Sequence, residues 1–247
     1  MSRVVIVGAT STIGSHCARL WAAEKDAHIT LVGRDIIGCK AVAEDLRVRN
    51  PNTEIAVVES DLLDPVAIDH YVAEVSAAGH IDVVLICHGE MLDQRQCELN
   101  TADCQSSLIV NGVSPALHAE AFSRVMEIQG FGCLGLISSV AGDRGRKSNY
   151  TYGAAKGLLI RYAQGLQHRF SGTGVSICLI KPGPTRSRMT ARLAIDGRSL
   201  ADPSEVATSI VNGLKKRKRV IYAPGKWLFI MIVIRLMPPA IFNRLNI

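Results

Sequence analysis

The chain has 247 residues, enough to bury a large core without disulfides, and without a Pro/Gly/Ser-rich linker or internal repeat we expect residues 1–247 to form one domain. Its formal net charge is +6, yet its one dense basic run lacks interleaved aromatic residues, so we expect no nucleic-acid partner. Its seven cysteines are odd in number and include no Cys-x-x-Cys pair, so we expect reduced thiols in a cytoplasmic protein. We also expect no signal peptide before the first apolar run and no metal site.

Short apolar runs recur along the chain and alternate with helical stretches. Runs of this kind are typical of buried parallel strands. The pattern predicts an α/β fold built on a single doubly wound parallel sheet, Rossmann-like, with helices on both faces. The runs cover residues 4–7, 29–32, 55–58, 83–86, 134–137, 175–180 and 220–222.

The first run leads into a turn of small residues between Gly8 and Gly14, followed by a helical stretch. The backbone N–H groups of such a turn and the helix N-terminus can bind a pyrophosphate. Thr12 stands where a dinucleotide-binding turn often has glycine, so the spacing alone is equally compatible with an ordinary β–α connection.

The end of the second run bears on the choice of cofactor. At this tip a carboxylate binds a free ribose 2′-hydroxyl, whereas an arginine pairs with a 2′-phosphate. Gly33 has no side chain and Arg34 comes next, which favours NADP(H). Asp35 keeps NAD(H) open, and a solvated loop cation is the other interpretation of Arg34.

Tyr152 and Lys156 point most directly to chemistry. Because they are four residues apart, a helix would place both on one face, one turn apart. We expect the ammonium group to favour the phenolate and so to lower the pKa of Tyr152 toward the range of an acid–base catalyst. Ser139, upstream, could hold the substrate oxygen, and its neighbour Ser138 is the alternative.

Together these segments resemble the short-chain dehydrogenase/reductase family over nearly the whole chain. The resemblance implies a catalytic tetrad of Asn111, Ser139, Tyr152 and Lys156. It implies cofactor contacts from Gly8, Ser11, Thr12, Ile13, Gly14, Arg34, Asp61, Leu62, His88, Gly89, Tyr152, Lys156, Pro182, Gly183 and Thr185. Two motifs depart from the family pattern: only Gly89 is kept of an Asn-Asn-Ala-Gly motif, and Ser187 stands where threonine is usual.

The resemblance also implies a reaction, in which NADP(H), or NAD(H), reduces a carbonyl to a secondary alcohol. Tyr152 would protonate the developing alkoxide, and Ser139 would steady the carbonyl oxygen. Lys156 would lower the tyrosine pKa and bind the nicotinamide ribose, and Asn111 would hold a water that links Lys156 to solvent. A homodimer or homotetramer is expected from the same resemblance.

The end of the chain is basic and then apolar. Five cations at 215–219 are followed by the segment 227–247, in which residues 227–234 are all apolar. A membrane-spanning helix needs about 20 such residues, and Arg235 interrupts this one early. We expect 227–247 either to lie in the interface of an anionic membrane, with the five cations beside it, or to fold against the protein as a substrate lid or subunit interface.

The ending 236–247, the stretch 142–147 and Ala223-Pro224 resemble the decaprenylphosphoryl-2-keto-ribose reductases of mycobacterial cell-wall synthesis. This resemblance implies a keto-sugar on a polyprenyl phosphate as substrate, and an enzyme peripheral on the membrane. Cations expected near the active site are Arg144, Arg146, Lys147, Arg186 and Arg188. A reductase for a soluble or lipophilic ketone and a non-catalytic cofactor-binding regulator stay open as alternatives.

Overall fold

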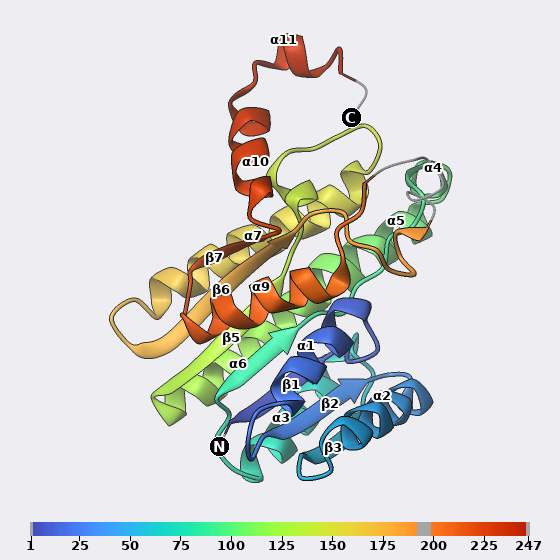
Figure 1. Cartoon of the computed structure of the whole chain (residues 1–247). Coiled ribbons are helices and arrows are strands. Elements are labelled where there is room, and N and C mark those ends of the chain that lie inside the picture. The colour runs from blue at the N-terminus through green and yellow to red at the C-terminus, as the bar shows by residue number, and fades with distance from the viewer. Residues whose placement is uncertain (1, 192–198, 246–247) are drawn as a thin grey trace.

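The computed structural model describes residues 2–191 and 199–245, and its centre is one sheet of seven parallel strands (Figure 1). The strand order is β3-β2-β1-β4-β5-β6-β7. The strands are β1 Arg3–Val7, β2 His28–Gly33, β3 Glu54–Glu59, β4 Val83–Ile86, β5 Phe131–Ile137, β6 Gly174–Pro182 and β7 Val220–Ala223. Every predicted apolar run lies in one of these strands, and the predicted fold class is confirmed.

Helices cover both faces of the sheet. The buried residues of α1, α2 and α9 pack on one face, and those of α3, α6 and α7 pack on the other. The helices are α1 Thr12–Ala22, α2 Ile36–Arg49, α3 Pro65–Ala77, α4 Gln94–Leu99, α5 Thr101–Leu108, α6 Ser114–Gln129, α7 Tyr150–Arg169, α9 Pro203–Lys215, α10 Lys226–Leu236 and α11 Pro239–Phe242. A π-helical turn, η1 Ile109–Val113, joins α5 to α6, and a 3₁₀ turn, η2 Val140–Asp143, follows β5. The core therefore forms two layers, one on each side of the sheet.

The strand order reverses direction at β1, which lies between β2 and β4. At such a switch point the connections leave toward opposite faces, and a crevice opens beyond the carboxyl ends of the strands. The turn after β1 and the loops after β4, β5 and β6 all meet at this end. The topology thus brings together segments that are far apart in the sequence.

The five-cation run and the apolar tail lie at opposite ends of β7. Val220, at the start of β7, pairs with Leu179, and Ala223, at its end, pairs with Pro182. The run at 215–219 comes before the strand, whereas α10 follows it at the carboxyl end of the sheet (Figure 1). The expectation that both would meet one membrane surface is therefore wrong. Within residues 2–191 and 199–245, no helix is long and apolar enough to cross a bilayer.

Candidate active site

The turn after β1 is built so that it can approach the end of β4 closely. Gly8 has a φ of +81°, and a Cβ there would come within 2.6 Å of His88. A Cβ on Gly14 would lie 2.7 Å from the Sγ of Cys87. Ser11 caps α1, since its Oγ accepts the N–H of Gly14 at 2.9 Å. Only glycine fits at both close approaches.

This turn suits the pyrophosphate of a dinucleotide cofactor. Thr12 and Ile13 begin α1, where N–H groups have no acceptor inside the helix. Those groups and the helix dipole favour an anion. Because Gly8 and Gly14 present no side chain, the backbone can come close to the phosphates. The residues present therefore fit a nicotinamide dinucleotide at this turn.

Arg34 and Asp35, the two residues at the tip of β2 that bear on the choice of cofactor, have different environments. Arg34 is exposed beyond the strand. Asp35 is the N-cap of α2, and its Oδ1 accepts the N–H of Gly38 at 2.9 Å. The Asp35 carboxylate is thus engaged as the cap of α2, whereas the Arg34 side chain is exposed to solvent.

Three polar side chains, Ser114, His88 and His118, cluster beside Leu62, one of the predicted cofactor contacts. The Ser114 hydroxyl donates to the Leu62 carbonyl at 2.5 Å and lies 2.8 Å from Nε2 of His88. Its single proton is used by Leu62, so His88 donates from Nε2. His118 donates from Nδ1 to the Ser114 carbonyl at 2.8 Å, and the two imidazole rings are 4.9 Å apart. His88, which replaces the alanine of the family motif, therefore packs as a neutral ring against a second neutral ring.

Burial sets the charge state of both histidines. It lowers the pKa of His118 to about 4 and the pKa of His88 well below its usual value, with the neighbouring His118 acting in the same direction on His88. Sequence reasoning missed this pairing because nothing in the spacing of residues 88 and 118 brings the two side chains together.

Tyr152 and Lys156 lie one turn apart on α7, with the Lys156 Nζ 5.7 Å from the Tyr152 ring centroid. The expected lowering of the tyrosine pKa does not occur in the protein chain alone. Burial raises the pKa of Tyr152 to about 12, and a hydrogen bond with Ser139 offsets only part of this. Burial also lowers the pKa of Lys156 to about 8. Desolvation of both groups exceeds the attraction between phenolate and ammonium at this distance.

Asn111 and Lys156 meet beside Gly89. A Cβ on Gly89 would be 2.8 Å from Asn111 Oδ1 and 3.5 Å from Lys156 Nζ. Lys156 Nζ donates to the Ile137 carbonyl at 3.2 Å, and Asn111 Oδ1 accepts the N–H of Glu90 at 3.0 Å. Asn111 is fully buried in the π-helical turn η1, a local irregularity that is frequent at functional sites. The structure thus places the side chains of Asn111 and Lys156 next to the same glycine, Gly89.

The two adjacent serines after β5 have different environments. Ser138 is buried, and its Oγ donates to the Lys156 carbonyl at 2.9 Å. Ser139 is half-buried; its Oγ accepts the N–H of Ala141 at 3.1 Å and lies within reach of Tyr152. Ser138 therefore anchors α7, and Ser139 is the serine on the Tyr152 side.

The loop after β6 carries Pro182, Gly183 and Thr185. Gly183 donates its N–H to the Ala223 carbonyl at 3.0 Å, and the Thr185 hydroxyl donates to the Gly183 carbonyl at 2.9 Å. The Trp227 indole of α10 lies directly against Gly183, where a Cβ would fall 1.8 Å from Nε1. Gly183 is needed because the tail packs on this loop.

The five cations expected near the active site have four different placements. Arg144 and Arg146 contact the tail: the Nη1 of Arg144 donates to the carbonyls of Ile234 and Met237, and Arg146 contacts a tail methionine sulfur. Arg186 pairs with an aspartate, and Lys147 is exposed. Arg188 donates to the Thr10 carbonyl at 3.3 Å, so it is the cation that reaches across to the turn after β1.

Two further groups of contacts were not predicted from the sequence. Gln94 of α4 caps α7, accepting the N–H of Thr151 at 3.0 Å. Asp143, at the end of η2, pairs with buried Lys181 at 2.5 Å and accepts the Tyr222 hydroxyl at 2.9 Å. These contacts hold the start of the Tyr152 helix and the turn after Ser139.

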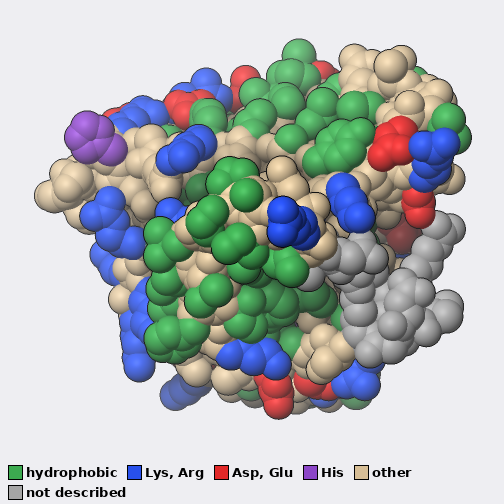
Figure 2. Space-filling model, turned by 90° about the horizontal axis from the view of Figure 1, so that it is seen from above, with side chains coloured by type: hydrophobic (Ala, Val, Ile, Leu, Met, Phe, Trp, Pro, Cys, Tyr) green, Lys and Arg blue, Asp and Glu red, His purple; other side chains and the backbone are tan. Residues whose placement is uncertain are grey.

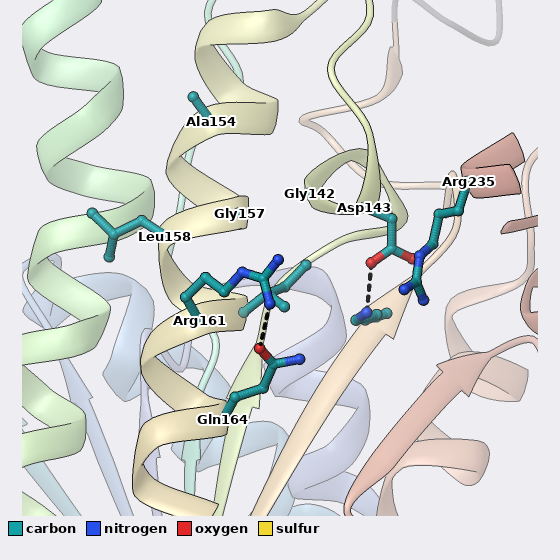
Figure 3. A pocket seen from close by; sticks show the side chains of 10 residues that line it. Gly142, Asp143, Ala154, Gly157, Leu158, Arg161, Gln164 and Arg235 are labelled. Carbon is teal, nitrogen blue, oxygen red and sulfur yellow. Dashed lines mark hydrogen bonds and ion pairs between the residues drawn. The ribbon is translucent and has the colours of Figure 1, made fainter. Parts of the chain in front are cut away.

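A pocket of about 470 Å³ borders this network (Figure 3). It is lined by η2, the outer face of α7 and Arg235, which extends from α10 toward Asp143. Ala154, Leu158 and Arg161 lie on the face of α7 opposite Tyr152. This pocket is therefore distinct from the space beside the four residues of the predicted tetrad.

The comparisons with known proteins agree with this architecture. Residues 2–196 match the short chain dehydrogenase family model, so the chain belongs to the short-chain dehydrogenase family and is an oxidoreductase. An uncharacterized oxidoreductase of Streptomyces coelicolor is 30% identical over 98% of this chain and 95% of its own.

Solved structures share the fold. Levodione reductase matches with a TM-score of 0.83 and 21% identity, over 92% of this chain and 98% of its own. A short-chain dehydrogenase from Sphingobium yanoikuyae in complex with NADPH matches with a TM-score of 0.79 and 19% identity, over 100% of this chain and 97% of its own. Members of the family act on carbonyl substrates and use NAD(P).

Proposed function

We propose that this protein is an NADPH-dependent reductase that converts a ketone to a secondary alcohol, with Asn111, Ser139, Tyr152 and Lys156 as its catalytic tetrad. The observation that carries the proposal is the meeting of these side chains beside the turn after β1. The bound dinucleotide would supply the hydride. Tyr152 would donate the proton to the substrate oxygen, which Ser139 would hold. Lys156 would orient the ribose, and Asn111 would connect Lys156 to solvent.

The pKa of Tyr152 fits a proton donor. A phenol with a pKa of about 12 is fully protonated at neutral pH, so it enters the reaction carrying the proton that the alkoxide needs. Lys156, with a pKa of about 8, can pass a proton onward near neutrality. The pH profile of turnover is expected to report these two groups together, as shifted by the bound cofactor.

NADP(H) is the preferred cofactor in this proposal, because Arg34 is free for a 2′-phosphate while Asp35 is occupied as a helix cap. Arg34→Ala is expected to weaken NADPH binding about tenfold and to leave NADH binding nearly unchanged, since one charge-assisted contact contributes about 1.5 kcal/mol. Fluorescence titration of both cofactors measures this. NADH binding as tight as NADPH binding in the unmodified protein contradicts the preference.

For the substrate, we propose a keto-sugar on a polyprenyl phosphate used in cell-surface polysaccharide synthesis. The support is the resemblance of residues 142–147 and 236–247 to reductases of that class, together with an apolar tail seated on Gly183. The enzyme would act from the cytoplasm at the membrane that holds the lipid, as a homodimer or homotetramer. The alternative is a reductase for soluble or lipophilic ketones, favoured if simple ketones are reduced as fast as any lipid-linked sugar.

The deciding experiment follows NADPH oxidation with a panel of short ketones, long-chain ketones and polyprenyl-phosphate keto-sugars. Reduction of the lipid-linked sugar with the highest kcat/KM supports the specific proposal. Absence of NADPH oxidation across the panel, with NADPH still bound, favours a cofactor-binding regulator.

A further inference from the structure

Helix α10 is apolar on both of its faces. Trp227, Met231 and Ile234 follow helical spacing and face the protein, with Met231 fully buried. The opposite face consists of exposed side chains at positions i, i+1, i+4, i+5 and i+8. These are Leu228, Phe229, Ile232, Val233 and Leu236, with exposed fractions of 41%, 72%, 43%, 61% and 79%. We call these five residues the α10 outer face.

The α10 outer face cannot be turned inward, because α10 is attached at both ends. At its start, Trp227 lies against Gly183. At its end, Arg144 donates to the carbonyls of Ile234 and Met237, both at 2.5 Å, and stacks on the Phe242 ring with 3.8 Å between the guanidinium carbon and the ring centroid. The helix therefore presents its outer face away from the sheet.

The surface around the α10 outer face is basic. Viewed from above the carboxyl ends of the strands, hydrophobic side chains form a continuous region, with Lys and Arg side chains along much of its margin and fewer Asp and Glu side chains (Figure 2). The sequence contains no Asp or Glu after Glu205. Lys226, Arg244 and Lys147 are exposed at the start of α10, after α11 and after η2. An apolar stripe with cations beside it is complementary to anionic headgroups above acyl chains.

A second copy of the chain suits this surface less well. The tail offers no Asp or Glu side chain to pair with the cations of another tail. A contiguous apolar region of this kind is rarely left in water by a monomer, so it needs an occupant. The charges favour an anionic one.

We propose that the α10 outer face docks the protein on the surface of an anionic lipid bilayer, with α10 lying in the plane of the interface. The side chains of the outer face enter the boundary between headgroups and acyl chains, and Lys226 and Arg244 contact the headgroups. Tyr152 lies at the same end of the sheet, so docking turns the active site toward the membrane. The purpose of docking rests on the proposed function, but docking itself does not require substrate.

The test uses the full chain and sedimentation with vesicles of phosphatidylcholine, with or without phosphatidylglycerol. We expect binding to the vesicles that contain phosphatidylglycerol, and weaker binding in 0.5 M salt, a condition that screens exposed charges. The double variant Phe229→Gln/Val233→Gln is expected to bind at least about tenfold more weakly, because two apolar side chains would no longer enter the boundary between headgroups and acyl chains. Lys226→Gln is expected to weaken binding severalfold.

Matched controls separate docking from general effects. Val48→Gln/Ile128→Gln changes two exposed apolar residues elsewhere, at 83% and 90% exposure, and is expected to bind vesicles as well as the unmodified protein. Lys216→Gln/Lys218→Gln neutralises two cations of the run at the other end of β7 and is also expected to bind normally.

Three outcomes would overturn the proposal, and the first two are an absence of binding to anionic vesicles and an equal loss of binding in the control variants. A third is that Phe229→Gln/Val233→Gln changes the oligomer measured by analytical ultracentrifugation and leaves vesicle binding unchanged, which would assign the face to a second copy. NADPH titration and reduction of a soluble ketone are measured in parallel. If the unmodified protein bound no NADPH, or oxidised none with any ketone of the panel described above, the proposed function would be refuted and the docking result would stand.

Discussion

The carboxyl end of the sheet carries two regions built in opposite ways. In the proposed catalytic centre, Lys156 and Asn111 are buried polar groups, and each has hydrogen-bond partners within the chain. In the tail, Phe229 and Val233 are apolar groups left mostly exposed. Buried polar groups need partners inside the protein, whereas exposed apolar groups need an occupant outside it. The buried polar groups of the first region therefore have their partners inside the chain, whereas the exposed apolar groups of the second region need a partner outside it.

The two regions are joined by the turn η2. Ser139 precedes this turn, Asp143 ends it, and Arg144 follows and holds α10. A change at Asp143 should therefore affect the folded state more than any change on the tail surface.

The largest expected effect comes from Asp143→Ala. It leaves the Lys181 ammonium buried, at 6% side-chain exposure, without its carboxylate, and we expect the free energy of unfolding to fall by about 3–5 kcal/mol. Urea denaturation measures the change. The matched control is Asp69→Ala, which breaks an exposed pair with Arg124 and should lower stability by about 1 kcal/mol or less. Equal effects of both variants would show that the buried pair has no special role.

The next effect is the pH dependence of stability. The pKa of His118 is about 4 in the folded protein, below its value of 6.5 when unfolded, so the unfolded chain binds the extra proton between these values. Stability is therefore constant above pH 6.5 on this account and falls as the pH drops toward 4, by about 3 kcal/mol in total. His88 acts in the same direction.

Denaturation curves at several pH values measure this slope. His118→Gln is expected to reduce the slope between pH 6 and pH 4.5 by about 1.4 kcal/mol per pH unit, because one titrating group is removed. An unchanged slope would show that His118 is not held neutral by burial.

Tyr152→Phe tests the catalytic centre itself. It removes the proposed proton donor and keeps the ring, so turnover of the best ketone should fall by about a hundredfold or more, equivalent to about 2.7 kcal/mol. NADPH binding should persist, as measured by fluorescence titration. Tyr150→Phe, an exposed tyrosine two residues earlier, is the matched control and should keep normal turnover. Wild-type turnover by Tyr152→Phe would refute the tetrad.

Features with a periodic or local basis could be predicted from the sequence. The strand assignments follow from uninterrupted apolar runs, because parallel strands covered on both faces need apolar side chains at every position. The spacing of Tyr152 and Lys156 placed them on one face of a helix for the same local reason. The positions of the tetrad members relative to one another came from the family resemblance.

Features that depend on tertiary contacts could not be predicted. The shift in the pKa of Tyr152 depends on burial, which exceeds the effect of the lysine. The separation of the 215–219 run from α10 depends on the direction of β7 in the sheet. Gln94 reaches α7 across 57 positions of sequence, and no local pattern marks a cap supplied from another helix.

The smallest expected effect is a change in the free energy of unfolding on the outer face of α10, which is compared with a change on its buried face. Phe229 is 72% exposed and Met231 is fully buried, although only one residue separates them. Phe229→Gln should change the free energy of unfolding by no more than about 0.5 kcal/mol, because it leaves the packed side untouched. Met231→Ala should lower it by about 2–5 kcal/mol through the cavity it leaves. Urea denaturation without lipid compares the two variants. If Phe229→Gln were as destabilising as Met231→Ala, the outer face would already be covered in solution, and the tail would belong to the same class of region as the catalytic centre.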